Sequence, residues 1–542
     1  MRYDQILSKA RTVCGCQNDD RCMEVRISGS PEQTAALFEQ LGDGMRTSGL
    51  DGRVIRTGSF GYYDLEPVIS IRKPGRPTLL YGKAAPETVS ALLDDYPARG
   101  GTTPDGVLCS SDLPLFRAQR RIALRNCGLI DPEAIDHYIA VGRGYSGLSR
   151  VLATDRAEVI EALRNSGLDS AAGCRAADKL QALGEAGGDE KFVTCNALDA
   201  NPGGRTARLL LEGDPHGVFE GMLIAAYAVG AGRCIIVADS RRTTGIRRIT
   251  KALEEMKDSG LAGGDILGAG FSCEVEIREA TPSLTMGEET ALLRLLEGKQ
   301  AMPDFRPMDS GVLLLSGRPC LVDDIETFAK ISAVFQDAPE WRAGPEAEKR
   351  RGTRVLTLTG DVGHAYTVEV PVETTIRTLV AGIGGGVATG GRLKAVQFGG
   401  PTGSLLGPDS LDLPIGAVAE AGPDTGSATI EVFDARRCAV EIAEERMAYL
   451  QTQSCGKCVF CREGTFQMSD ILRSVAAGEG TARDLDLLSE LGEAMRTGCV
   501  CAIGAAAANP VLSGIKLFRE EYEEHIRGKI CKSGSRRSSH QV

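Results

Sequence analysis

Three cysteines, each separated from the next by two residues, lie near the end of this 542-residue chain in the segment SCGKCVFCREG. Cys455, Cys458 and Cys461 offer the thiolates that iron–sulfur clusters and structural zinc sites use as ligands. In a cubane cluster each thiolate binds a different iron, so one loop with three ligands needs a chain-distant fourth cysteine. The spacing therefore predicts one [4Fe-4S] cluster in this part of the chain.

The fourth ligand is expected in the later segment TGCVCAIGAAAANP, which offers both Cys499 and Cys501. The spacing alone does not choose between them. Gly456 permits a tight backbone in the first loop, and Lys457 and Arg462 are expected to offset the negative charge of the cluster. Zinc is the alternative metal, but zinc sites usually bring two C-x2-C pairs, and this chain offers a run of three.

The composition indicates a soluble, multidomain protein. The chain carries 17 cysteines, a net charge of −11 and a pI near 5.3. This acidic balance argues against a nucleic-acid or anionic-membrane binder. The N-terminal residues lack the apolar core of a secretion signal, and the most apolar run is too short to cross a bilayer. We therefore expect a cytoplasmic protein without direct membrane insertion, whose clustered cysteines serve metal or redox chemistry rather than disulfides.

The pattern of apolar residues divides the chain into several units. The large central block alternates helical and strand patterns, as in GMLIAAYAVGA followed by CIIVADS and then GIRRITKALEEMKDSG, which predicts a parallel sheet with crossover helices. The predicted units are a polar leader with Cys14, Cys16 and Cys22 (1–23), a small α/β domain (24–105), the large α/β domain (106–350), a β-grasp domain (351–437), a helical domain (438–530) and a disordered tail (531–542).

Several segments share the motifs of one family, in that family's order. They are CNALDANPGG, LEGDPHGVFEGMLIAAYAVGA, MGEETALLRLLEG, LVDDIETFAKI, QFGGPTGSLLG, SCGKCVFCREG and CAIGAAAANPVLSGIKLFREEYEEHI. Over about residues 140–530 the chain resembles the NADH-binding flavoprotein subunit of respiratory complex I. The same subunit type occurs in electron-bifurcating hydrogenases and NAD-dependent formate dehydrogenases.

The resemblance implies a multidomain α/β and α+β architecture. Its parts are a thioredoxin-like domain, a Rossmann-like flavoprotein domain, an SLBB-like β-grasp domain and a C-terminal helical [4Fe-4S] domain. It also implies that the fourth cluster ligand is Cys501, which leaves Cys499 as a spare thiol. The remaining FMN and NAD site residues that it implies are Gly173, Asn196, Gly287, Glu288 and Glu289.

The flavin pocket departs from the family pattern. The family's glycine-rich loop, SGLRGRGGAGFPTGxKW, is SGLDSAAGCRAADKLQA here, with Asp169 in place of an arginine and Gln181 in place of a lysine. Leu284 replaces a stacking tyrosine, and Asp323 and Asp324 replace two asparagines. These changes remove close backbone approach, remove cations and add anions around a phosphorylated ligand. We therefore expect that FMN and NAD(P)H are disfavoured at this site.

The N-terminal domain resembles a thioredoxin-like ferredoxin domain that carries a two-iron cluster in hydrogenases. Ser28, Gln33, Ser59 and Tyr63 lie near the places where the family has its cluster cysteines. Without thiolates at these positions, the domain is expected to serve as a structural remnant or a docking surface.

Together these features predict an iron–sulfur electron-transfer subunit of an oxidoreductase complex whose partner subunits carry iron–sulfur and flavin centres. Two alternatives remain open: an active NAD(P)H:FMN oxidoreductase (diaphorase) subunit, and a docking subunit whose cluster is purely structural.

Overall fold

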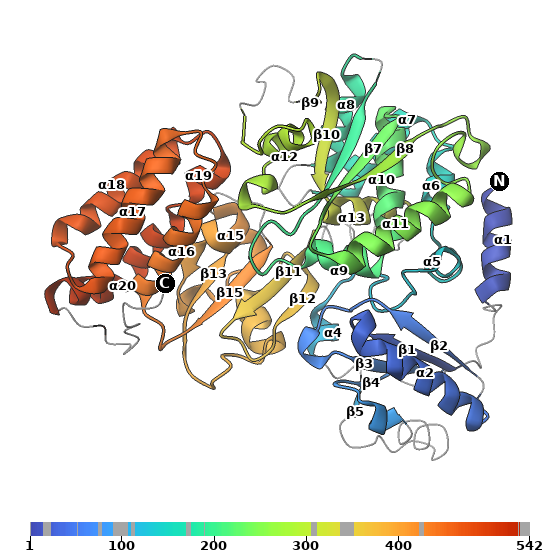
Figure 1. The fold of residues 1–542 in the computed structure, drawn as a ribbon, viewed down its shortest axis with the longest axis horizontal. Helices are drawn as coiled ribbons and strands as arrows, with labels where there is room; N and C mark the ends of the chain where they lie inside the picture. Colours follow the sequence, from blue (N-terminus) through green and yellow to red (C-terminus); the bar gives the residue numbers. More distant parts are fainter. Residues whose placement is uncertain are drawn as a thin grey trace.

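The structure, a computed structural model, describes residues 2–14, 23–50, 52–73, 78–89, 107–109, 114–169, 175–188, 190–304, 312–336, 352–421, 428–528 and 531. Within these residues three units are each built on a five-stranded sheet, and a fourth consists of helices. The helical unit lies at one end of the molecule and the N-terminal sheet towards the other (Figure 1). The multidomain α/β and α+β architecture expected from the sequence is confirmed.

The N-terminal unit is a mixed sheet with strand order β2-β1-β3-β4-β5, in which β1 is parallel to β2 and antiparallel to β3. Its helix begins at a capping box, where Ser30 and Gln33 exchange side-chain-to-backbone hydrogen bonds. The sheet extends past the predicted boundary at residue 105, because the three residues of β5 are too few to show a strand pattern in the sequence. The elements are β1 (Met23–Ser28), α2 (Pro31–Thr47), β2 (Gly52–Thr57), η1 (Tyr63–Leu65), β3 (Val68–Arg72), β4 (Leu79–Tyr81) and β5 (Val107–Cys109). Of the helix predicted over 85–101, residues 86–89 are helical and the remainder lies outside the described residues.

The large domain contains the predicted parallel sheet. Its strand order is β8-β7-β6-β10-β9; the first four strands are parallel and the short β9 is antiparallel. The strands β6, β7 and β10 are mostly buried, which explains their largely apolar sequences, whereas β8 at the edge is more exposed and carries charged residues. The strands are β6 (Phe192–Ala197), β7 (Arg233–Asp239), β8 (Glu274–Ala280), β9 (Leu313–Leu315) and β10 (Arg318–Asp324). The helices are α4 (Pro114–Ala118), α5 (Ile135–Gly142), α6 (Ser146–Val151), α7 (Arg156–Ser166), α8 (Ala176–Glu185), α9 (Thr206–Gly213), α10 (Pro215–Val229), α11 (Thr243–Asp258), η3 (Ile266–Gly268), η4 (Leu284–Gly287), α12 (Glu289–Leu296) and α13 (Ile325–Phe335).

A buried carboxylate organises the core around α10. Glu220 accepts hydrogen bonds from the Tyr138 hydroxyl at 2.6 Å, the Tyr145 amide at 2.8 Å and the Leu148 amide at 3.0 Å. The Gln336 side-chain amide donates a fourth, at 2.5 Å. Burial raises the pKa of Glu220, and these donors oppose that rise. The network therefore joins α10 to the α5–α6 segment and to the end of α13.

The third unit is the β-grasp domain, with strand order β12-β11-β15-β13-β14 and β11 parallel to β15. The helix predicted over TTIRTLVAGIGGG is present as a π-helical turn. The elements are β11 (Thr353–Gly360), β12 (Tyr366–Pro371), η6 (Thr378–Ile383), β13 (Leu393–Phe398), η7 (Gly400–Thr402), β14 (Ser404–Leu406), η8 (Pro408–Ser410), α15 (Ile415–Ala421) and β15 (Thr429–Asp434). Buried Glu369 accepts hydrogen bonds from the amides of Ile122 at 2.7 Å and Leu124 at 3.0 Å, which ties this sheet to the chain entering the large domain.

The C-terminal unit is a bundle of α16 (Ala439–Gln453), α17 (Val459–Ala477), α18 (Ala482–Gly498), α19 (Ala502–Ala506) and α20 (Asn509–Gly528). Its core contains the apolar stripes seen in the sequence, including Met468, Leu472, Leu488, Met495 and Tyr522. Cys531 packs against this core, so the predicted disordered tail begins at least one residue too early. Residues 532–542 lie outside the described residues.

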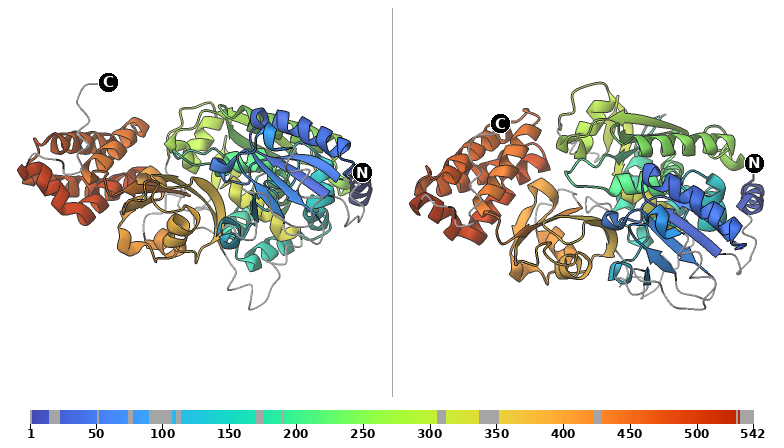
Figure 2. Two further views of the ribbon diagram at one scale, coloured as in Figure 1. Left: turned by 90° about the horizontal axis from the view of Figure 1, so that it is seen from below. Right: turned by 60° about the horizontal axis from the view of Figure 1, so that its bottom comes forward.

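The leader forms helix α1 (Tyr3–Cys14), which the polar sequence did not reveal. It buries Ile6 and Ala10, and the Tyr3 hydroxyl donates a hydrogen bond to the Gly144 carbonyl at 3.1 Å. Figure 2 shows this helix at the end of the molecule opposite the C-terminal bundle. Cys16 and Cys22 lie outside the described residues. Among the described helices, none is both long and apolar enough to span a membrane.

The close crossing of α10 and α13 gives a test of the fold. A Cβ atom at Gly221 would lie 1.8 Å from the carbonyl oxygen of Phe328, so alanine there must push the two helices apart. We expect Gly221→Ala to destabilise the large domain by about 2–3 kcal/mol. Thermal unfolding followed by circular dichroism measures this change.

The matched control is Gly184→Ala in helix α8, where the nearest atom to the new methyl group lies 3.8 Å away. This variant should unfold at the same temperature as the parent or slightly higher, because alanine is favoured over glycine in a helix by about 1 kcal/mol. Equal unfolding temperatures for both variants would contradict the close crossing.

Candidate functional site

The three spaced cysteines lie around the start of α17. Cys458 is the N-cap residue of this helix and Cys461 lies in its first turn, while Cys455 precedes them in the loop. Gly456 has φ +78°, a left-handed conformation that glycine adopts without strain. The first loop therefore has the tight backbone that its sequence predicts.

The second cysteine pair lies against the first loop. Cys501 is the N-cap residue of α19, and its sulfur accepts a hydrogen bond from the Gly504 amide at 3.5 Å. A Cβ atom at Gly504 would lie 3.1 Å from the Cys499 sulfur and 3.4 Å from the Cys461 Cβ, so glycine permits the two loops to meet. The fold thus brings together cysteines that are about forty residues apart in sequence.

The thiols influence one another electrostatically. A hydrogen bond from Cys499 lowers the pKa of Cys461 to about 6, against the opposing effect of burial. Burial raises the pKa of Cys501 to about 11, and negative charge on Cys461, Cys455 and Cys458 adds to that rise. Four or more convergent thiols fit a cluster that binds as thiolates. Both Cys499 and Cys501 lie beside the first loop, so the geometry leaves both as candidate fourth ligands.

The segment that carries Cys455, Cys458 and Cys461, here called the cluster loop, contacts the large domain. Lys457 donates to the Pro303 carbonyl at 2.8 Å and pairs with Asp304 at 2.9 Å. Just before the loop, the Gln453 side-chain oxygen accepts the Leu284 amide at 3.0 Å. Lys457, which the sequence predicted to offset the cluster charge, also pairs with Asp304 across the domain boundary.

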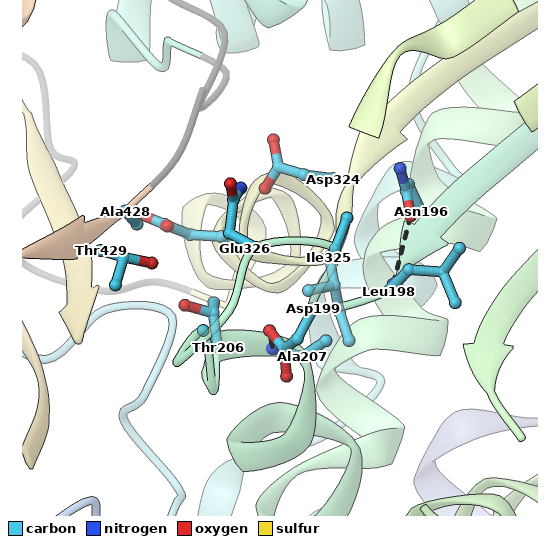
Figure 3. Close-up of a pocket in the computed structure, with 13 residues that line it drawn as sticks. Asn196, Leu198, Asp199, Thr206, Ala207, Asp324, Ile325, Glu326, Ala428 and Thr429 are labelled. Carbon is cyan, nitrogen blue, oxygen red and sulfur yellow. Dashed lines mark hydrogen bonds between the residues drawn. The ribbon is translucent and has the colours of Figure 1, made fainter. Parts of the chain in front are cut away.

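A pocket of about 110 Å³ opens at the carboxyl ends of β6 and β10, where α/β sheets bind ligands. Figure 3 shows Asp324 and Glu326 between Asn196 and the β-grasp residues Ala428 and Thr429. A third carboxylate comes from Asp199. Among the described residues that line the pocket, none is basic.

Each carboxylate already has partners. Asp199 accepts the amides of Ala207 at 2.9 Å and Arg208 at 3.0 Å, at the start of α9. Asp324 caps α13 and accepts the Thr327 amide at 2.9 Å. Burial raises the pKa of both Asp199 and Glu326. The pocket therefore needs no bound cation to satisfy its acids.

The predicted cofactor residues fall at and beside this pocket. The Asn196 side chain donates to the Met286 carbonyl at 2.9 Å and accepts the Leu198 amide at 3.1 Å, so both of its ends are engaged by the protein. Gly287 is exposed at the end of η4. Glu288 caps α12 by accepting the Ala291 amide at 3.0 Å. Gly173 lies outside the described residues.

Lys179 is a site residue that the sequence motifs did not reveal, because alignment with the family motif pointed to Gln181. Its ammonium lies 2.8 Å from Glu289 and 3.4 Å from Asp323, and it also donates to the Val322 carbonyl at 3.3 Å. Its position in the helix could have revealed Lys179. It follows buried Ala176 by three residues in α8, so both side chains lie on the buried face of that helix.

The charges of this cluster are strongly interdependent. Burial raises the pKa of Asp323 to about 8, and the Lys179 ammonium opposes that rise. Burial lowers the pKa of Lys179, but the attraction of Asp323 and Glu289 outweighs it, so the net shift is upward. Lys179 is therefore held as a cation whose charge Glu289, its closer partner, already balances.

The four residues that the resemblance places near cluster-cysteine positions in the N-terminal domain make internal and interdomain contacts. Ser28 bonds the Thr57 hydroxyl at 2.7 Å, Gln33 completes the capping box of α2, and Ser59 bonds Glu66. Tyr63 donates to Thr367 of the β-grasp domain at 3.1 Å. Arg205 of the large domain stacks over the Tyr63 ring, 4.3 Å from its centre.

Comparison with known proteins identifies the family. Residues 441–525 match the NADH-ubiquinone oxidoreductase-F iron-sulfur binding region, and residues 166–333 match the Nuo51 FMN-binding domain. The NADP-reducing hydrogenase subunit HndC of Solidesulfovibrio fructosivorans is 37% identical over 420 residues, covering 77% of this chain and 85% of that protein. The chain belongs to the NADH-quinone oxidoreductase-F family. The resemblance inferred from the motifs is confirmed.

A further relative and a solved structure agree with the assignment. The NADH-quinone oxidoreductase-F protein of Streptomyces coelicolor is 33% identical over 392 residues, covering 72% of this chain and 87% of that protein. A chain of the NAD+-reducing [NiFe]-hydrogenase in its H2-reduced state shares the fold with a TM-score of 0.64 at 23% identity, covering 96% of this chain and 90% of that one. The convergent cysteines thus lie in the family's iron–sulfur region, and the acidic pocket lies at the edge of its FMN-binding domain.

The buried Lys179 cluster gives a direct test of these electrostatics. Lys179→Met should destabilise the protein by about 3 kcal/mol, because Glu289 then loses its balancing cation. The double variant Lys179→Met/Glu289→Gln should recover part of that loss, since it removes the unbalanced acid. Denaturant unfolding measures both changes.

The matched control is Lys257→Met on the exposed side of α11, which should change the unfolding free energy by less than about 0.5 kcal/mol. If Lys179→Met changes the free energy of unfolding as little as Lys257→Met does, the ion-pair cluster does not stabilise the protein as expected.

Proposed function

We propose that this chain is an iron–sulfur electron-transfer subunit of a multisubunit oxidoreductase, without FMN or NADH chemistry of its own. In this proposal Cys455, Cys458, Cys461 and Cys501 hold one [4Fe-4S] cluster, which accepts and passes on single electrons. The observation that carries the proposal is the convergence of two cysteine-bearing loops within the family's iron–sulfur region.

The surroundings of the cysteines support a relay role. At the start of α19 the Gly504 amide donates to the Cys501 sulfur, which favours the thiolate form and would tune a bound cluster. The contact between Lys457 and Asp304 holds the loop against the large domain. A fixed position is what an electron relay needs, because transfer depends on the distance to its donor and acceptor.

The proposal requires redox partners on other subunits. The relatives named above belong to an NADP-reducing hydrogenase and to an NADH-quinone oxidoreductase. We infer that this chain likewise assembles with subunits that carry flavin and iron–sulfur centres. The N-terminal domain, fastened by Tyr63 to two other domains, serves in this proposal as part of the docking surface.

The pocket in the FMN-binding region is poorly suited to a phosphorylated cofactor. Asp199 and Asp324 line it together with Glu326, whose charge Lys330 balances, and the nearby cation Lys179 is paired with Glu289. Asp324 also caps the start of α13, where free amides would otherwise favour an anion. Near a protein surface each close like charge costs about a few kcal/mol, which is enough to abolish micromolar binding.

The competing function is an active NAD(P)H:FMN oxidoreductase, and the match of residues 166–333 to an FMN-binding domain favours it. The two functions differ in whether isolated protein retains FMN and whether NAD(P)H reduces it.

The cluster assignment is tested by serine variants. Anaerobically purified protein should contain about four iron atoms and four acid-labile sulfides per chain, as one cubane requires. Cys458→Ser and Cys501→Ser should lose most of the iron and the visible absorption, and the bundle should become less stable because cluster binding also stabilises the fold.

Cys499→Ser is the matched control, since it removes a thiol beside the same loop but not a proposed ligand. It should retain about four iron atoms per chain. Loss of iron in Cys499→Ser with retention in Cys501→Ser would reverse the choice of fourth ligand. Six or more iron atoms in the parent would indicate a second cluster in the N-terminal part.

The cofactor proposal is tested by reconstitution with FMN followed by titration with NADH and NADPH. The parent should release FMN during gel filtration, and Asp324→Asn should bind it at least tenfold more tightly, because asparagine keeps the helix cap and removes a negative charge. Stoichiometric retention of FMN by the parent, with bleaching by NADH or NADPH, would establish the oxidoreductase instead.

A further inference from the structure

A side-chain hydroxyl lies beside the sulfur of one proposed cluster ligand. Ser454 Oγ is 3.4 Å from Cys461 Sγ. Both residues are half-buried, so water competes less for this contact than it does at an open surface. Cys461 belongs to the run of three cysteines, so the contact involves a proposed ligand whichever of Cys499 and Cys501 is the fourth.

The direction of this hydrogen bond follows from the chemistry of its two groups. A hydroxyl has one proton to donate and lone pairs that accept, whereas a cysteine that binds iron does so as a thiolate and has no proton. The Gly456 amide donates to Ser454 Oγ at 3.4 Å. This contact uses a lone pair of the oxygen and leaves the hydroxyl proton available. Ser454 is therefore the donor when Cys461 is a cluster ligand.

Ser454 is held in place by the end of a packed helix. It is the C-cap residue of α16, and its amide donates to the Gln451 carbonyl at 3.3 Å. The residue before it, Gln453, accepts the Leu284 amide of the large domain at 3.0 Å. The hydroxyl therefore projects from a helix end that contacts the large domain.

Cys461 is held by separate contacts. It lies in the first turn of α17, where the buried Thr465 hydroxyl donates to its carbonyl oxygen at 2.8 Å. A Cβ atom at Gly504 would lie 3.4 Å from the Cys461 Cβ, so the second cysteine loop packs against it. Because other contacts hold both partners, their hydrogen bond costs little additional ordering.

A hydrogen-bond donor at a ligand sulfur stabilises the reduced form of an iron–sulfur cluster. Reduction adds negative charge, and hydrogen bonds to the sulfurs are one of the features that set the reduction potential. Hydrogen bonds from the Cys499 thiol and, less strongly, from Ser454 lower the pKa of Cys461 against the opposing effect of burial. Both donors thus favour negative charge on this sulfur.

We propose that Ser454 is a positioning residue that raises the reduction potential of the cluster by donating its hydroxyl proton to the Cys461 sulfur. This inference rests on the proposed iron–sulfur function and adds to it a residue that is not a ligand. Through this contact the end of α16, which meets the large domain at Gln453, influences how readily the cluster accepts an electron.

The test is a redox titration of the full-length protein, purified anaerobically and followed by electron paramagnetic resonance, with iron counted in every sample. Ser454→Ala should keep the iron content of the parent. Its midpoint potential should fall by about 30–60 mV, equivalent to a three- to tenfold lower ratio of reduced to oxidised cluster at a fixed potential. Ser454→Thr keeps the hydroxyl and should restore the parent potential. Ser489→Ala is the matched control, because it removes a partly buried hydroxyl that bonds the Leu485 carbonyl in α18, and it should leave the potential unchanged.

An unchanged potential in Ser454→Ala with full iron content overturns this inference and leaves the proposed cluster intact. An equal fall in Ser454→Ala and Ser454→Thr also overturns it, because that result indicates a disturbed loop. If Ser454→Ala loses its iron, resonance Raman spectra of the parent decide the question: transfer to D2O should shift the iron–sulfur stretching bands, and unshifted bands contradict the hydrogen bond. Absence of iron from the parent overturns the proposed function itself and this inference with it.

Discussion

The contact between the cluster loop and the large domain joins the proposed iron–sulfur site to the cofactor cleft. Leu284 comes from the large domain, yet its side chain is buried in the core of the bundle, and its amide bonds Gln453 at 3.0 Å. Lys457 adds an ion pair to Asp304 on the same side. Leu284 stands where the family motif has a tyrosine that stacks on the cofactor. The residue that departs from the family pattern in the cofactor cleft is thus also the one that anchors the bundle.

In the cofactor cleft the acidic side chains pair with lysines of the same domain or with backbone amides at helix starts. Lys179 lies between Glu289 and Asp323, and Lys330 pairs with Glu326 at 2.5 Å. These pairs and the helix caps satisfy the acids without any ligand. Since apolar burial around α10 holds the sheet and its helices together, the domain can keep its fold whether or not a cofactor binds.

The sequence predicted best those helices and strands whose apolar pattern lies within one continuous segment. The strand β7 and the helices α10 and α11 appear in their predicted order, because continuous apolar runs and a 3.6-residue period are local properties. The cysteines of the first loop were found by spacing for the same reason. Helix α1 was missed because Ile6 and Ala10 form too short a stripe to stand out in a polar segment.

The missed site residues have a different cause, since their chemistry exists only after folding. Lys179 becomes significant when α8 brings it to Asp323, 144 residues further along the chain. Cys438 and His525, which are 87 residues apart, likewise meet only in the folded bundle, where the Cys438 sulfur lies 3.5 Å from the His525 Nε2.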